Sequence, residues 1–167
     1  NYIESSRKQA AADGRPAPTV FDISQNDWGG PCQCDKCQAI ARAEESEAGP
    51  LIDFLNAISD AIRPQYPEVF LDTLAYQYTQ KAPKSIRPRD NLLIRLCDTT
   101  SNFTKPITDP ANAAFREHLL SWAAIAKHLR IWDYAVTYAQ PYGLPMPTVQ
   151  TYPMGFDTGR RLTPYLA

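Results

Sequence analysis

The chain has 167 residues, of which 44% are hydrophobic, and this is enough for one globular core. A net charge of −1 excludes the basic surface on which binding to nucleic acids and anionic membranes depends. No apolar run approaches the ~20 residues of a membrane span, and residues 1–15 lack the apolar core of a signal peptide. We therefore expect no nucleic-acid partner and no membrane span.

Helices and strands are expected to alternate along the chain. In order, the predicted elements are a helix over 2–13, a strand over 19–24, helices over 36–43 and 50–63, strands over 69–76 and 91–97, a helix over 110–128 and a strand over 129–135. Gly14 and Pro16 are expected to end the first helix. Asp109 followed by Pro110 is typical of a helix N-terminus. The proline-rich connection 81–88 carries too few helix signals for a crossover helix.

This alternation predicts an α/β fold with a parallel sheet. The strands are nearly continuous apolar runs, which is typical of strands covered on both faces. Polar residues follow each strand, and no strand is followed by a glycine-rich phosphate loop. We therefore favour part of a (β/α)₈ TIM barrel, with an open parallel α/β sheet as the alternative. A complete barrel typically needs about 250 residues. Residues 1–150 are therefore expected to form a partial barrel domain, and residues 151–167 a C-terminal tail of unassigned structure.

Residues suited to sugar chemistry gather at the expected strand ends. Asp27 and Asp133 are the candidate catalytic residues, because glycosidases use two carboxyl groups or one carboxylate that orients the acetamido group of the substrate. As alternatives, Asp27 caps a turn and Asp133 pairs with an arginine. Nearby rings and amides suit the apolar faces and hydroxyls of sugars. The candidate substrate-binding residues are Asn26, Trp28, Tyr76, Tyr78, Arg95, Trp132 and Tyr134.

Other charged residues are predicted to have structural roles. Asp22 and Asp72 lie inside strands, as buried partners or as groups at the bottom face of the barrel, and a structural role is favoured for both. The acidic run of residues 44–47 is typical of a solvated face or of a helix N-terminus. His118 and His128 are expected in, or at the end of, the helix over 110–128, away from the strand ends.

Cysteines form the most specific local spacing in the sequence. Cys32, Cys34 and Cys37 lie at the start of a helix, where the helix dipole favours thiolates. Cys97 closes a strand and is expected on the same side of the sheet, so four sulfurs would suit a structural, tetrahedral Zn²⁺. Disulfides or unlinked thiols are the alternatives, because no second C-x₂-C pair is present. We expect no cofactor for catalysis.

The segments FDISQNDWGGPCQCDKCQAI, GPLIDFLNAISDAI, LDTLAYQYTQKAPK, RPRDNLLIRLCD and LRIWDYAVTY resemble the bacterial domain of unknown function 4838, which is linked to glycoside hydrolase family 163. The resemblance covers about residues 18–148. It implies a TIM barrel with endo-β-N-acetylglucosaminidase activity on N-glycans, exported to the periplasm, the cell surface or the medium. It also implies substrate-assisted hydrolysis, in which the acetamido oxygen attacks the anomeric carbon and a glutamate acts as general acid.

We therefore expect a glycoside hydrolase whose partner is an oligosaccharide or the glycan of a glycoprotein. No glutamate occupies a predicted strand end, so the strand ends indicate substrate binding more strongly than proton transfer. The alternatives are a non-catalytic carbohydrate-binding domain and a zinc-stabilised interaction domain.

Overall fold

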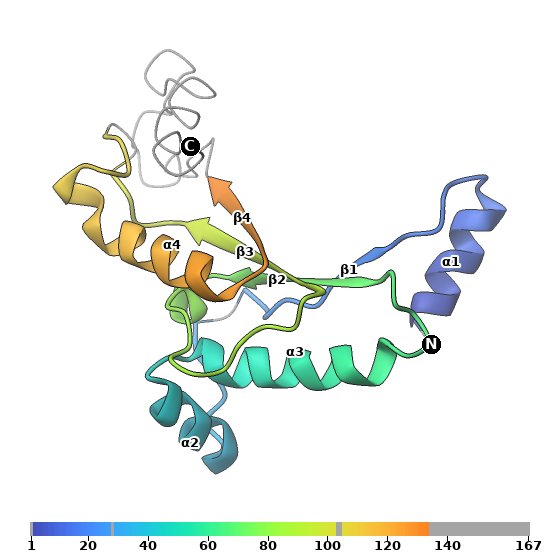
Figure 1. The fold of residues 1–167 in the computed structure, drawn as a ribbon, viewed down its shortest axis with the longest axis horizontal. Coiled ribbons are helices and arrows are strands. Elements are labelled where there is room, and N and C mark those ends of the chain that lie inside the picture. Colours follow the sequence, from blue (N-terminus) through green and yellow to red (C-terminus); the bar gives the residue numbers. More distant parts are fainter. Residues whose placement is uncertain (1, 28, 103–104, 134–167) are drawn as a thin grey trace.

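The computed structural model describes residues 2–27, 29–102 and 105–133. In chain order its elements are α1 (Tyr2–Ala12), β1 (Val20–Asp22), α2 (Asp35–Glu44), α3 (Ala48–Ile62), β2 (Phe70–Ala75), the 3₁₀ turn η1 (Gln77–Thr79), β3 (Leu92–Asp98), the 3₁₀ turn η2 (Pro110–Asn112), α4 (Ala113–Ile125) and β4 (His128–Asp133). The four strands form one parallel sheet in the order β1-β2-β3-β4 (Figure 1). The predicted α/β class and parallel sheet are confirmed.

Local signals explain where the helices begin and end. Gly14 has a φ of 65°, the left-handed conformation that commonly follows a helix, and α1 ends two residues before it. The side chain of Asp109 accepts a hydrogen bond from the amide of Ala111 (2.9 Å) and so caps η2, as predicted. One prediction was wrong: His128 does not end a helix but begins β4, where its ring stacks edge-on against Phe70 at 5.3 Å.

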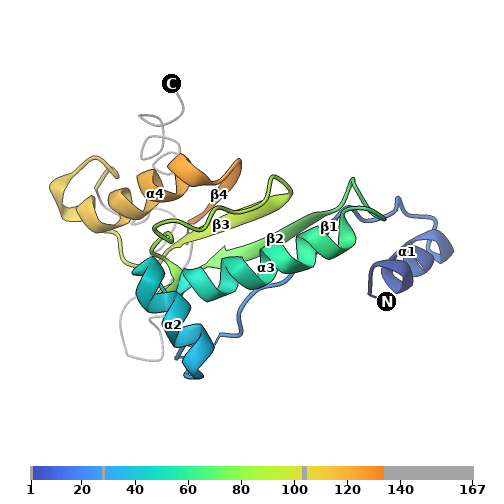
Figure 2. The same cartoon turned by 60° about the horizontal axis from the view of Figure 1, so that its bottom comes forward.

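The hydrophobic core lies on one face of the sheet. Successive side chains of a strand point to opposite faces, so one set of alternate positions faces the core. The buried strand residues of this face are Phe21, Leu71, Ala75, Leu92, Ile94 and Leu96. Helices α3 and α4 contribute Ile52, Leu55, Phe115, Leu119 and Trp122 to the same cluster. Figure 2 shows α3 running along the sheet. The opposite face is therefore the one that carries the polar residues described below.

A non-helical segment, residues 80–91, completes the connection from β2 to β3, as predicted. Glu44 at the end of α2 anchors it, because its carboxylate accepts hydrogen bonds from the amides of Ser85 (2.6 Å) and Ile86 (2.9 Å). Asn56 of α3 both donates to and accepts from the same segment. The prediction of a solvated face is wrong for Glu44, which is only 5% exposed, since donors from the segment replace its water.

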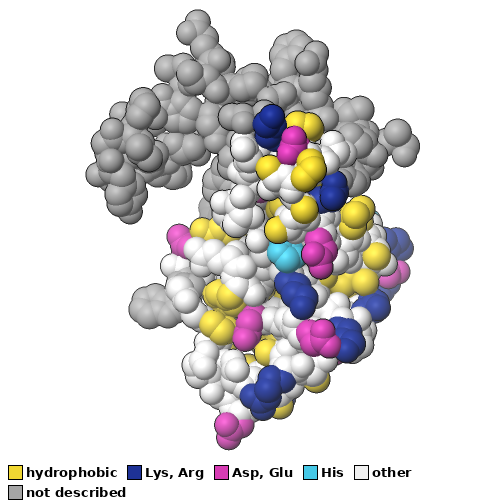
Figure 3. All heavy atoms as spheres, turned by 90° about the vertical axis from the view of Figure 1, so that its left-hand side faces the viewer, with side chains coloured by type: hydrophobic (Ala, Val, Ile, Leu, Met, Phe, Trp, Pro, Cys, Tyr) yellow, Lys and Arg dark blue, Asp and Glu magenta, His cyan; other side chains and the backbone are white. Residues whose placement is uncertain are grey.

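The described surface is mixed in charge. On the side drawn in Figure 3, acidic and basic side chains are interspersed with apolar ones. Among the helices of the described residues, none combines the length and the apolar character needed to cross a membrane.

Candidate functional site at the carboxyl ends of the strands

Ion pairs cross three strands on the face opposite the core. Arg95 of β3 pairs with Asp22 of β1 (Nη2–Oδ2 2.6 Å) and with Asp72 of β2. The side chain of Asp72 is 9% exposed and that of Asp22 is 52% exposed. The Arg95–Asp72 pair, called the inner pair below, is therefore the one shielded from water. The Arg95 guanidinium also lies 5.1 Å from the centre of the Trp132 ring. This pairing agrees with the structural roles predicted for the two aspartates.

A pocket of about 380 Å³ lies at the carboxyl ends of the strands. Its lining residues are Gln25, Asp27, Leu74, Tyr76, Arg95, Cys97 and Trp132. Four of the predicted catalytic and sugar-binding residues are in this set, and they bring a carboxylate, a phenol, a guanidinium and an indole to one cavity. They come from four different strands or the loops that follow them, because the carboxyl ends of parallel strands meet at one edge of the sheet.

Hydrogen bonds between loops hold the wall of this pocket. The side-chain amide of Gln25 donates to the carbonyl of Tyr76 (3.1 Å), and the Thr79 hydroxyl donates to Gln25 Oε1 (2.6 Å). Gln80 donates to the backbone at the end of β3 (2.6 Å), and its own carbonyl accepts from the Trp122 indole (2.8 Å). Of these residues, only Gln25 carried a signal in the sequence, as an amide directly after the predicted strand over 19–24. Thr79, Gln80 and Trp122 were not predicted as positioning residues, because their partners lie far from them along the chain.

Asp27 lies at the rim of the pocket, and its side chain is exposed. Its Oδ1 is 3.4 Å from Gln77 Nε2, a long hydrogen bond. Gln77 has a φ of 51°, which is uncommon for a residue other than glycine and is often found near functional sites. Asn26 is also exposed and does not line the pocket.

The structure does not bring the second candidate carboxylate, Asp133, into this pocket. In the register of β3 and β4, Trp132 lies beside Cys97 and Asp133 lies beside Asp98. Because side chains alternate along a strand, Asp133 points to the face opposite Trp132. The geometry therefore gives the pocket one of the two predicted catalytic residues.

Among the remaining predicted sugar-binding residues, Tyr78 is described by the structure and does not line this pocket. Tyr78 lines two neighbouring pockets, of about 200 and 330 Å³, which it shares with Glu47. Burial, with a smaller effect of the Glu47 charge, raises the pKa of the Tyr78 phenol. Trp28 and Tyr134 lie outside the described residues.

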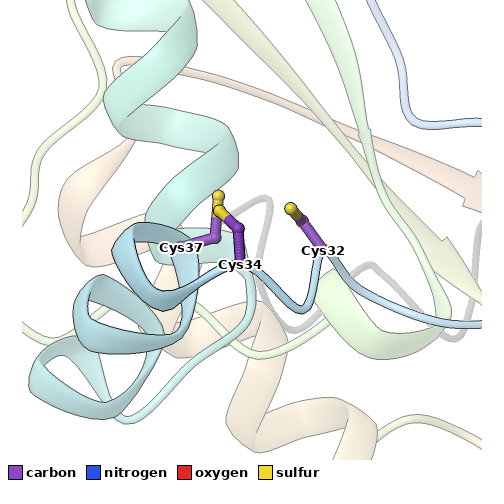
Figure 4. A group of neighbouring side chains, drawn as sticks. All are labelled: Cys32, Cys34 and Cys37. Atoms are coloured by element: carbon purple, nitrogen blue, oxygen red, sulfur yellow. The ribbon is translucent and has the colours of Figure 1, made fainter.

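Three of the four predicted metal ligands form a compact group. The sulfurs of Cys32, Cys34 and Cys37 all lie within 4.8 Å of one another, and Figure 4 shows them converging at the start of α2. This group can hold a metal ion. Cys97 is not part of it, so the predicted set of four sulfurs is corrected to three. Cys97 belongs to β3, where it is buried and its thiol donates to the Arg95 carbonyl (3.7 Å).

Residues 5–157 match a family described as "Domain of unknown function (DUF4838)". The chain belongs to the DUF4838 family. The match includes all four strands, the strand-end pocket and the three-cysteine group. No curated protein and no solved structure matches the chain.

In this DUF4838 chain two of the three thiols, those of Cys34 and Cys37, differ in acidity. Hydrogen bonds from the Cys37 backbone amide and from the neighbouring thiols lower the pKa of Cys34 to about 7. Hydrogen bonds with the thiols of Cys34, first, and of Cys32 raise the pKa of Cys37 to about 11. Thiolates are the metal-binding form of cysteine, so the group begins to charge near neutral pH.

Proposed function

We propose that this DUF4838 chain supplies the sugar-binding edge of a (β/α)₈-barrel glycoside hydrolase that acts on N-acetylglucosamine-containing glycans. The observation that carries the proposal is the strand-end pocket of about 380 Å³. It combines the carboxylate of Asp27 with the phenol of Tyr76 and the indole of Trp132. Sugars present apolar C–H faces and many hydroxyls, and such a mixture of rings and polar groups matches both.

The strand order supports the barrel over an open sheet. In a doubly wound sheet the order reverses at a switch point, whereas here the strands follow one another as β1-β2-β3-β4. Right-handed crossovers between such sequential strands place all connections on one face, and α3 and α4 contribute to one core cluster there. The face that carries Arg95 would then line the interior of the barrel.

The proposed reaction cleaves a β-N-acetylglucosaminyl linkage, with the acetamido oxygen of the substrate attacking the anomeric carbon. In this scheme the Asp27 carboxylate orients the acetamido N–H, and Tyr76 and Trp132 hold the sugar ring. Arg95 is a positioning residue, because its ion pairs place it beneath the Trp132 ring. No glutamate lines the pocket in the described residues, so the role proposed for this chain is binding and orientation. Export from a bacterial cell would bring the pocket to glycans.

We also propose that the three-cysteine group binds a structural Zn²⁺. Zinc takes four ligands and binds thiolate sulfurs at about 2.3 Å, and sulfurs within 4.8 Å of one another are compatible with this. Cys32 and Cys37 also line the pocket of about 200 Å³ that contains Glu47. This pocket leaves room for a water molecule or a carboxylate as the fourth ligand.

Cleavage of a complex N-glycopeptide by the complete hydrolase of which this chain is proposed to form one edge, followed by mass spectrometry, tests the proposed activity. Asp27→Asn should lower the rate by about 10²-fold or more, the usual effect of removing a positioned catalytic group. Asp133→Asn should have a smaller effect, and the control Asp53→Asn changes an exposed residue of α3 and should have none. Equal rates for Asp27→Asn and the native protein would refute the role of Asp27. Glycan binding without cleavage would favour a non-catalytic carbohydrate-binding domain.

A further inference from the structure

We propose that a metal ion held by the three-cysteine group (Cys32, Cys34 and Cys37) clamps the loop of residues 26–31 and so fixes Asp27 in the strand-end pocket. The effect on sugar binding rests on the proposed function, whereas the effect on the loop does not. On binding, each protonated thiol releases its proton to solvent and its sulfur donates an electron pair to the metal, without any change of oxidation state.

The first end of this loop is already fixed. Gln25 directly precedes it and makes two side-chain hydrogen bonds, to the carbonyl of Tyr76 (3.1 Å) and with the hydroxyl of Thr79 (2.6 Å). It also lines both the strand-end pocket and the pocket beside the cysteines. Gln25 is therefore held in place by hydrogen bonds between the strand-end pocket and the pocket beside the cysteines.

The described residues in the middle of the loop, Asp27, Gly29 and Gly30, make few contacts with the rest of the described chain. Asp27 is exposed and is held by the long hydrogen bond from Gln77 (3.4 Å). At Gly29 and Gly30, an added Cβ would meet no atom within 4 Å. The contacts within the described part of the loop thus leave the position of Asp27 to be set by the two ends.

The second end depends on the cysteines. The carbonyl of Cys32 accepts a hydrogen bond from Gln38 of α2 (2.9 Å), and its sulfur faces the two thiols at the start of that helix (Figure 4). Helix α2 is anchored in turn by Glu44, whose buried carboxylate binds the segment of residues 80–91. A metal would join Cys32 to this anchored helix by coordinate bonds in addition to one hydrogen bond. Both ends of a six-residue loop would then be held.

Two measurements on the purified protein test the clamp. The first is the zinc content after dialysis against Zn²⁺, where we expect about one equivalent, lost in Cys34→Ser and kept in the control Cys97→Ala. The second is hydrogen exchange of a peptide spanning residues 24–33, with Zn²⁺ or with a chelator. Zinc should slow its exchange by about tenfold or more, while exchange in α4 stays unchanged. The chelator arm uses the native protein, so the test does not depend on a variant that folds.

The outcomes separate the clamp from the proposed function. Zinc binding without slower exchange in residues 24–33 would overturn the clamp, and so would a failure to bind zinc. The affinity for the disaccharide of N-acetylglucosamine is measured in the same two conditions and should rise with zinc in the native protein but not in Cys34→Ser. An affinity that zinc leaves unchanged would overturn the link to Asp27. Slower exchange with no sugar binding in either condition would support the clamp on the loop and refute the proposed function alone.

Discussion

Replacing Arg95 with methionine removes the cation that neutralises Asp72 inside the sheet while keeping an apolar stem of similar length. The Asp72 side chain is 9% exposed, and its buried Oδ1 has no hydrogen-bond partner in the described part of the chain. Removing one partner of a buried pair costs about 3–5 kcal/mol, because a charge stays buried without compensation. The pair with Asp22, which is half exposed, contributes about 1 kcal/mol or less. Arg95→Met should therefore lower the free energy of unfolding by about 3–5 kcal/mol, and Asp22→Asn by about 1 kcal/mol at most.

Urea unfolding followed by circular dichroism at neutral pH measures both effects. The double variant Arg95→Met/Asp72→Leu is the sharpest control. It removes both charges of the inner pair and should recover much of the stability lost in Arg95→Met, since a buried pair exchanged for apolar groups is often nearly neutral. If Arg95→Met unfolds within about 0.5 kcal/mol of the native protein, Arg95 does not neutralise a buried carboxylate and the reasoning is refuted.

Four further variants test the packing of the fold. Burial raises the pKa of Glu44, but hydrogen bonds from a hydroxyl and two backbone amides outweigh it and hold this pKa below its ordinary value of 4.5. The stabilisation by this carboxylate is thus present above about pH 4.5 and lost as the pH falls through the folded-state pKa. The loss of unfolding free energy in Glu44→Gln, measured with urea, should therefore shrink between about pH 6 and pH 3. A loss that does not depend on pH would contradict this role of Glu44. Gly49→Ala would place a Cβ 2.9 Å from the Glu44 side chain and should cost about 1–3 kcal/mol, whereas Gly30→Ala, with open space, should be neutral in thermal unfolding. Trp122→Phe removes the indole hydrogen bond to Gln80 and should cost about 1–3 kcal/mol in urea unfolding; an unchanged midpoint would show that this bond does not stabilise the fold.

Local sequence signals were sufficient to predict the order of the elements. The Asp109-Pro110 cap and the glycine after α1 act over a few residues, so they can be read without knowing the fold. The burial of Glu44 could not be read in this way. Its partners, Ser85 and Ile86, lie about forty positions further along the chain and reach it only when α2, α3 and the connecting segment are packed together.

The candidate site was predictable only in part, for a similar reason. Parallel strands share one carboxyl edge, so Asp27 and Trp132 could be expected near each other from the strand pattern alone. A shift of one residue in the pairing of β4 with β3 decides whether Trp132 or Asp133 faces the pocket. A nearly continuous apolar strand sequence does not specify which of the two faces its residues take. Cys97 was expected beside the other three cysteines because Cys97 and the three-cysteine group both follow or close a strand. In the structure Cys97 belongs to β3, where its thiol is buried.

The sugar-binding role of the strand-end pocket is tested most directly by calorimetric titration with a complex N-glycan. The comparison is between two partly exposed aromatic residues: Trp132, which lines this pocket, and Phe54, which lines the pocket beside the cysteines. The native protein should bind, Trp132→Ala should bind about tenfold or more weakly, a loss of about 1.4 kcal/mol, and Phe54→Ala should bind as the native protein does. Equal affinities for the two variants, or no binding by the native protein, would contradict the proposed function.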